Sequence, residues 1–175
     1  ELELKNMLYS ATLPRYPTTV IRYPRGTGQG ASWRDEAFEE IPVGKGIKLH
    51  EGEGIAILTI GAVGNKASEA VLKAEGEGIQ VLHFNMRFIK PIDEEILSEA
   101  CRKAPTIITV EDGALYGGLH SAVSEYVTTN GLGNKVISLG IPDRFIEQGS
   151  VAELHRECGY DAESIYNAIK ENYKR

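Results

Sequence analysis

The sequence predicts an α/β protein, a three-layer α/β/α sandwich around a mostly parallel sheet of five strands. From Ile55 onward, strand-like runs alternate with helical patterns, as the crossovers of a parallel sheet require. The run 55–61, IAILTIG, is apolar throughout, which is typical of a central strand buried on both faces. The strand expected at 45–50 is joined to it by EGEG, and so short a connection permits only an antiparallel pair.

The elements after the central strand follow one another with short connections. A helix is expected at 65–78, where Ala67, Ala70, Val71 and Ala74 form an apolar stripe. The helix at 91–104 has acidic residues in its first turn and Arg102 and Lys103 in its last, which suits the helix dipole. The remaining elements of the alternation are strands at 79–85, 106–110 and 135–140 and a helix at 117–131.

Two further helices are expected at the end of the chain, after a loop at 141–149. The helix at 150–159 begins with Ser150 as its cap, and the helix at 161–175 begins with Asp161 in the same role.

The first 44 residues follow a different pattern. Leu4, Met7, Leu8 and Ala11 form a helical stripe, and a strand is expected at 18–24, TTVIRYP. One helix and one strand cannot bury their own apolar faces, so residues 1–30 are interpreted as the remnant of an upstream α/β domain. Residues 31–44 show no periodicity and carry an acidic cluster, and they are interpreted as a linker.

Composition excludes several classes of protein. The net charge of -6 is spread along 175 residues, whereas a protein that binds nucleic acid would have a basic cluster. No apolar run approaches the roughly 18 residues of a membrane span. Cys101 and Cys158 are far apart and lack CxxC spacing, which indicates a reduced, cytoplasmic protein. The four histidines show no spacing typical of metal ligands.

Three loops are expected at the carboxyl ends of parallel strands, where ligands bind in such sheets. The loop Gly61–Asn65 precedes a helix and could hold a phosphate on its backbone amides, but it lacks the GxGxxG and P-loop patterns. Asn65 is more simply interpreted as a helix cap. The other two loops are Glu111–Gly118, EDGALYGG, and Gly140–Gly149, GIPDRFIEQG.

Glu111 and Asp112 are adjacent carboxylates at a strand end. Because successive strand residues point to opposite faces, they would make a poor acid/base pair. The favoured interpretation is that one caps a turn and the other is solvated. His120, just inside the following helix, is interpreted as a surface histidine. Whether any of the three lies near an active site stays open.

The stretch Ile21–Gly30, IRYPRGTGQG, places Arg25 directly after the carboxyl end of the expected strand. A guanidinium at this position can hold a phosphate through two parallel hydrogen bonds. Arg22 lies within the strand and is interpreted as a structural partner in an ion pair.

Five motifs in this order, IRYPRGTG, IPVGKG, MRFIKPID, TVEDGALYGG and LGIPDRFIEQG, closely resemble the C-terminal part of the 1-deoxy-D-xylulose-5-phosphate synthase family. The resemblance covers essentially the whole chain. It implies that residues 1–30 are the tail of a pyrimidine-binding domain, 31–44 a linker and 45–175 a transketolase C-terminal domain. It also implies the strand order 1-3-2-4-5, with strand 1 antiparallel.

The resemblance implies that the full-length enzyme uses thiamine diphosphate and Mg²⁺. In that family, pyruvate condenses with glyceraldehyde 3-phosphate to give 1-deoxy-D-xylulose 5-phosphate and CO₂ for isoprenoid precursors. Of the family's active-site residues, only the arginine that holds the acceptor's phosphate falls on this chain, at Arg25. Catalytic, cofactor-binding and metal-binding residues are all expected upstream, so the fragment alone should bind no cofactor and be inactive. Leu119–His120 depart from the small residues usual after the glycine pair.

The resemblance also implies partners, namely the remaining domains of the same enzyme and a second copy in a homodimer. Two other interpretations remain open. One is a non-catalytic dimerisation or assembly module of another thiamine diphosphate enzyme, either transketolase or a 2-oxoacid dehydrogenase β-subunit. The other is an independent domain that binds a nucleotide or flavin.

Overall fold

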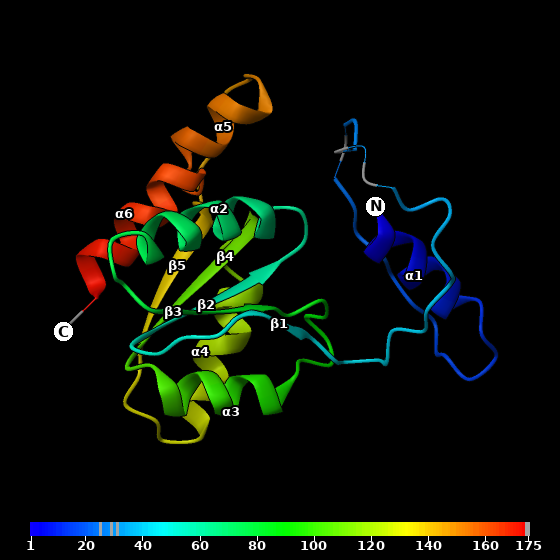
Figure 1. Ribbon diagram of the computed structural model, residues 1–175, viewed down its shortest axis with the longest axis horizontal. Helices are drawn as coiled ribbons and strands as arrows, with labels where there is room; N and C mark the ends of the chain where they lie inside the picture. Colours follow the sequence, from blue (N-terminus) through cyan, green and yellow to red (C-terminus); the bar gives the residue numbers. More distant parts are fainter. Residues whose placement is uncertain (25, 29, 31, 174–175) are drawn as a thin grey trace.

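The fold was analysed in a computed structural model, which describes residues 1–24, 26–28, 30 and 32–173. A central sheet lies between two layers of helices, and the N-terminal segment lies to one side of this sandwich (Figure 1). The strands are β1 (Ile47–His50), β2 (Ile55–Ile60), β3 (Val81–Asn85), β4 (Thr106–Ala114) and β5 (Lys135–Ile141). The helices are α1 (Leu2–Ala11), α2 (Gly64–Glu75), α3 (Glu94–Lys103), α4 (Leu119–Thr129), α5 (Val151–Glu157) and α6 (Ala162–Asn172).

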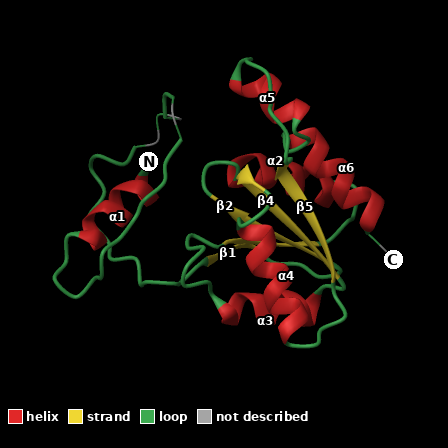
Figure 2. Cartoon of the chain, turned by 180° about the vertical axis from the view of Figure 1, so that it is seen from behind, coloured by secondary structure: helices red, strands yellow, loops and turns green. Residues whose placement is uncertain are grey.

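The strand order is β1-β3-β2-β4-β5, and β1 alone runs antiparallel to its neighbour. Helices α2 and α6 cover one face, whereas α3 and α4 cover the other (Figure 2). The predicted α/β/α sandwich, its mostly parallel five-stranded sheet and its antiparallel edge strand are therefore confirmed.

One step of the prediction was wrong. The four-residue connection had suggested that β1 pairs with β2, but β1 pairs with β3, which lies between β1 and β2. The strand order 1-3-2-4-5 that the family resemblance implied is confirmed. The connection Glu51–Gly54 therefore crosses the start of β3. Gly52 touches that strand, because a Cβ atom added there would lie 2.5 Å from the carbonyl oxygen of Val81 and 2.7 Å from its nitrogen. Only a residue without a side chain fits this crossing.

We expect Gly52→Ala to lower the free energy of unfolding by about 2 kcal/mol, because the obstructing atoms are backbone and cannot rotate away. Chemical denaturation monitored by circular dichroism would measure the change. Gly133→Ala is the matched control, since an added Cβ there meets nothing within 4 Å and the residue has no positive φ. Equal stability of the two variants would contradict the close crossing.

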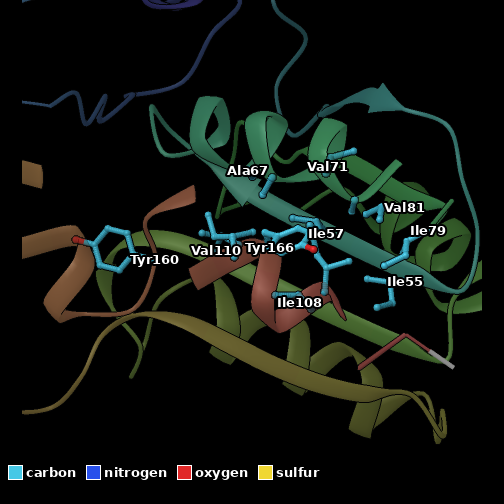
Figure 3. Close-up of a cluster of buried hydrophobic side chains, with 14 of the residues drawn as sticks. Ile55, Ile57, Ala67, Val71, Ile79, Val81, Ile108, Val110, Tyr160 and Tyr166 are labelled. Atoms are coloured by element: carbon cyan, nitrogen blue, oxygen red, sulfur yellow. The ribbon is translucent and has the colours of Figure 1, made fainter. Parts of the chain in front are cut away.

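The core on the α2/α6 face follows the sequence pattern closely. All six residues of β2 are buried, and so are the four stripe residues of α2, from Ala67 to Ala74. Figure 3 shows the cluster on this face, where Ala67 and Val71 of α2 lie against Ile57 and Val81 of the sheet. Tyr160, which is 2% exposed, lies at one end of this cluster. The sheet is thus fixed firmly beneath the loops at its carboxyl edge.

Three helices begin with a capping side chain, and the caps predicted for the last two helices, Ser150 and Asp161, are confirmed. In α3, Asp93 accepts hydrogen bonds from the amides of Glu95 and Ile96. Ser150 and Glu153 form a capping box at the start of α5, and Asp161 accepts a hydrogen bond from the amide of Ser164 in α6. These side chains satisfy amides that the helices leave unpaired.

The N-terminal segment differs from the prediction. Residues 17–24 form no strand, and Val20 is 94% exposed. A strand needs a hydrogen-bonding neighbour, and none of the described residues supplies one here. The buried residues of α1 are polar: Asn6 and Ser10 accept hydrogen bonds from the amides of Glu39 and Ile41. The helix therefore packs on residues 38–41 through its polar side.

Candidate functional site

The candidate site lies at the carboxyl edge of the sheet. Strands β2, β4 and β5 run parallel, so the loops Gly61–Asn65, Glu111–Gly118 and Gly140–Gly149 leave the same edge. Strand β4 continues through Glu111 and Asp112 to Ala114, four residues beyond the predicted end. These carboxylates therefore belong to the rigid sheet.

The Glu111 side chain is 1% exposed and faces α4. Its two carboxylate oxygens accept hydrogen bonds from the backbone amides of Leu119 and His120, each at 2.9 Å. A carboxylate on the first amides of a helix is favoured by the helix dipole as well as by the hydrogen bonds. Gly118 gives the carboxylate room, since an added Cβ atom there would clash with a carboxylate oxygen of Glu111. This confirms the predicted capping role of one carboxylate.

Asp112 points to the opposite layer. Its carboxylate is exposed and accepts a hydrogen bond of 2.9 Å from the hydroxyl of Tyr160. Burial first, and then this hydrogen bond, raise the pKa of Tyr160, so the hydroxyl remains a donor. The prediction that the second carboxylate is only solvated was therefore wrong, because Asp112 binds Tyr160. The prediction that the two carboxylates face opposite ways is confirmed. They cannot share a proton as an acid/base pair.

His120 is half-buried, so its interpretation as a plain surface histidine was wrong. Its amide donates to Glu111, and its ring Nδ1 is buried without a hydrogen-bonding partner among the described residues. Its position is set by the helix start, which the sequence placed correctly.

Two backbone amides of the loop Gly61–Asn65 are not free to hold a phosphate. The amides of Gly64 and Asn65 donate to the carbonyl oxygens of Gly61 and Ala62, so they are already used within the loop. The predicted capping role of Asn65 was also wrong, because Val63 is the capping residue and no side chain contributes. The helix already begins at Gly64, so Asn65 lies within its first turn rather than before it.

Arg25 lies outside the described residues. Arg22, three residues earlier, is exposed, and its Nη1 donates a hydrogen bond of 3.0 Å to the carbonyl oxygen of Asp112. Within the described part of the chain it pairs with no carboxylate, so the predicted ion pair was wrong. Without a strand at 18–24, the side chain does not point inward.

Sequence reasoning missed a second contact of the N-terminal segment with this edge. Glu3 of α1 accepts hydrogen bonds from Asn85 Nδ2 and from Arg87 Nε at the end of β3, the latter at 3.0 Å. Asn85 also accepts the amide of Arg87, whose φ is 56°. The signal available in the sequence was a polar residue at a strand end, Asn85, with Arg87 two residues later, which together could have indicated a contact with a carboxylate. The partner, more than 80 residues away, gave none.

The N-terminal segment also contains a groove. A groove of about 500 Å³ lies between α1 and the side chains of Trp33 and Phe38, away from the loops of the carboxyl edge. Across residues 1–24, 26–28, 30 and 32–173, no three His, Cys, Asp or Glu side chains come close enough to bind a metal ion. None of the helices described has the length and apolar character needed to cross a membrane.

Comparison with known proteins gives a consistent result. The family described as "Transketolase, C-terminal domain" matches residues 44–165. The 1-deoxy-D-xylulose-5-phosphate synthase of Bacteroides fragilis is 45% identical over 176 residues, which cover all of this chain and 27% of that protein. The synthase of Cytophaga hutchinsonii is 48% identical over 171 residues, covering 97% of this chain and 27% of the relative.

A solved structure described as "Split gene transketolase, inactive beta4 tetramer" has a TM-score of 0.71 and 31% identity. The match covers 78% of this chain and 45% of that one. The chain thus spans about a quarter of the length of the curated relatives, within which it matches the C-terminal part. The chain therefore belongs to the transketolase C-terminal domain family, and it corresponds to the C-terminal part of enzymes named 1-deoxy-D-xylulose-5-phosphate synthase.

Proposed function

We propose that this chain is part of an enzyme that condenses pyruvate with glyceraldehyde 3-phosphate, giving 1-deoxy-D-xylulose 5-phosphate and CO₂ for isoprenoid precursors. One observation carries the proposal: the identity of 45% to a named synthase extends over the whole chain, including residues 1–43, which lie outside the transketolase family match. The aligned region thus includes the segment with IRYPRG as well as the common domain. This favours the synthase over an independent nucleotide or flavin domain.

The proposal includes a division of labour along the full-length enzyme. Residues 1–30 would be the tail of the pyrimidine-binding domain, 31–44 a linker and 45–175 the C-terminal domain. Thiamine diphosphate, bound with Mg²⁺ by upstream domains, would supply the nucleophilic carbon that the reaction requires. The chain alone would then be inactive. We further propose that the enzyme is a cytoplasmic homodimer.

We propose that Arg25 binds the phosphate of glyceraldehyde 3-phosphate. A guanidinium can donate two parallel, charge-assisted hydrogen bonds to phosphate oxygens, and loss of this contact should cost about 1.5–3 kcal/mol. Pyruvate has no phosphate, so this contact would favour one substrate only. The role therefore predicts a selective kinetic effect.

In the full-length enzyme we expect Arg25→Ala to raise KM for glyceraldehyde 3-phosphate about 10- to 100-fold and to leave KM for pyruvate unchanged. Steady-state kinetics with each substrate varied in turn would measure both constants. Arg15→Ala is the control, because Arg15 forms an exposed ion pair with Glu40 in the same segment. Equal effects of Arg25→Ala on the two substrates would rule out the assigned role.

A second candidate function is a non-catalytic assembly module, which the neighbour named "inactive beta4 tetramer" favours. In this case the 175-residue chain would associate with itself in the absence of the upstream domains. Analytical ultracentrifugation over a range of concentrations should then show a dimer or larger species. A strict monomer at the highest concentration would count against self-assembly.

A further inference from the structure

The contact between Arg22 and Asp112 joins two parts of the chain that are 90 residues apart. Arg22 is the second residue of the IRYPRG stretch, and Asp112 lies two residues before the end of β4. The acceptor is the backbone carbonyl of Asp112, 3.0 Å from Arg22 Nη1. A backbone acceptor in a sheet has a fixed position, so it provides a reference point for the loop.

This reference point is held from both layers of the sandwich. On one side, the buried carboxylate of Glu111 is bound to the first two amides of α4. On the other side, the Asp112 carboxylate accepts the hydroxyl of Tyr160, a residue that is 2% exposed. The carbonyl that receives Arg22 therefore cannot shift without disturbing both helical layers.

Gly113 leaves the space that Arg22 occupies. A Cβ atom added at Gly113 would lie 2.8 Å from Arg22 Nη1, and the next nearest atom is a carboxylate oxygen of Glu111 at 3.5 Å. The guanidinium is thus the group that a side chain at 113 would displace. Gly113 has no positive φ, so its backbone does not itself require glycine.

We propose that Arg22, Asp112 and Gly113 are positioning residues, which fix the start of the IRYPRG loop against the carboxyl end of β4. The inference rests on the proposed function, since that loop carries Arg25 three residues further along the sequence. The contact of Glu3 with Asn85 and Arg87 provides a second anchor at the end of β3. In this way the C-terminal domain contributes to binding a phosphorylated aldehyde without touching it.

The test compares Arg22→Met and Gly113→Ala in the full-length enzyme. Both should raise KM for glyceraldehyde 3-phosphate about three- to tenfold, the value of one solvent-exposed hydrogen bond, and leave KM for unphosphorylated glyceraldehyde and for pyruvate unchanged. Gly113→Ala keeps the charge of Arg22, so its effect separates positioning from attraction by charge. Arg22→Lys should restore most of the loss, because it retains a donor. Gly133→Ala serves as the control for adding a methyl group.

Two measurements make the outcomes distinct. If Arg25→Ala shows no selective effect on the phosphorylated substrate, the proposed function of that residue fails and the inference fails with it. If Arg25→Ala is selective but Arg22→Met and Gly113→Ala match the wild type, only the positioning role is overturned. Amide hydrogen exchange over residues 20–28 should accelerate in both variants, and unchanged exchange would also overturn it. Because Arg22 is exposed, we expect Arg22→Met to fold even if Gly113→Ala does not.

Discussion

Glu111→Ala is expected to lower the free energy of unfolding by about 4 kcal/mol. The Glu111 carboxylate is 1% exposed and accepts two charge-assisted hydrogen bonds, each worth about 1.5–3 kcal/mol. Its removal leaves the amide of Leu119 buried without a partner, and leaving a buried donor unpaired adds to the cost. The stabilising charge at the start of α4 is lost as well. For a domain of this size, the melting temperature should fall by about 10 °C.

Thermal and chemical unfolding of the 175-residue chain would measure this change. Asp112→Asn is the matched control, because it alters the adjacent carboxylate while keeping an oxygen that can accept the Tyr160 hydroxyl. Glu111→Gln should fall between the wild type and Glu111→Ala, since one acceptor oxygen remains. A Glu111→Ala variant as stable as Asp112→Asn would show that the carboxylate does not hold α4.

The stability of the chain is expected to fall by about 3 kcal/mol as the pH decreases from 6.5 to 4, owing to His83. This side chain is fully buried on β3, and its Nε2 lies 3.1 Å from the hydroxyl oxygen of Thr59. Its Nδ1 has no partner among the described residues. Burial first, and then the nearby His50, lower the pKa of His83 from 6.5 to about 4.

The direction of this change in stability depends on which state, folded or unfolded, binds the proton. Between these two pH values the unfolded chain holds a proton on His83 and the folded chain does not, so each decrease in pH favours unfolding. Each pH unit of difference is worth about 1.4 kcal/mol. Above pH 6.5 the effect is absent, and below pH 4 it is complete. Paired carboxylates make stability depend on pH in a lower range. In Glu51, for example, Lys103 and then Lys48 lower the pKa to about 2.

Urea unfolding at a series of pH values would test this expectation. His83→Gln removes the titrating group, so its stability should vary much less between pH 6.5 and 4.5 than that of the wild type. The variant itself loses some stability at neutral pH, which is why the slope rather than the absolute value is compared. Parallel slopes for both proteins would assign the acid sensitivity elsewhere.

The sequence predicted those features of the fold that depend on local pattern. The apolar run of β2 and the stripe of α2 were read correctly, because burial on a strand or helix repeats at a fixed spacing. Ser150 and Asp161 were recognised as caps because a cap bonds to amides only three residues ahead. The partner of β1 could not be read from its turn, since turn length says nothing about a third strand lying between.

The candidate site was predicted only in part, because local pattern gives the direction of a side chain but not its partner. Strand alternation correctly indicated that Glu111 and Asp112 face opposite ways. Their roles depend on partners supplied by folding, such as Tyr160, which is 48 residues from Asp112. The strand expected at 18–24 had the right residues, but strand formation also needs a neighbour. Arg22 consequently turns to the sheet edge instead of inward.

The opposed carboxylates at the end of β4 also restrict how this part of the chain can change in length. Inserting or deleting one residue in the strand before Glu111 would rotate everything that follows by half a turn. Asp112 would then face the start of α4, and Glu111 would face Tyr160. Natural insertions and deletions in relatives should therefore avoid β4 and accumulate in connections such as 131–134 and 142–149. Protein engineers who wish to insert a peptide tag into this domain should choose the same places.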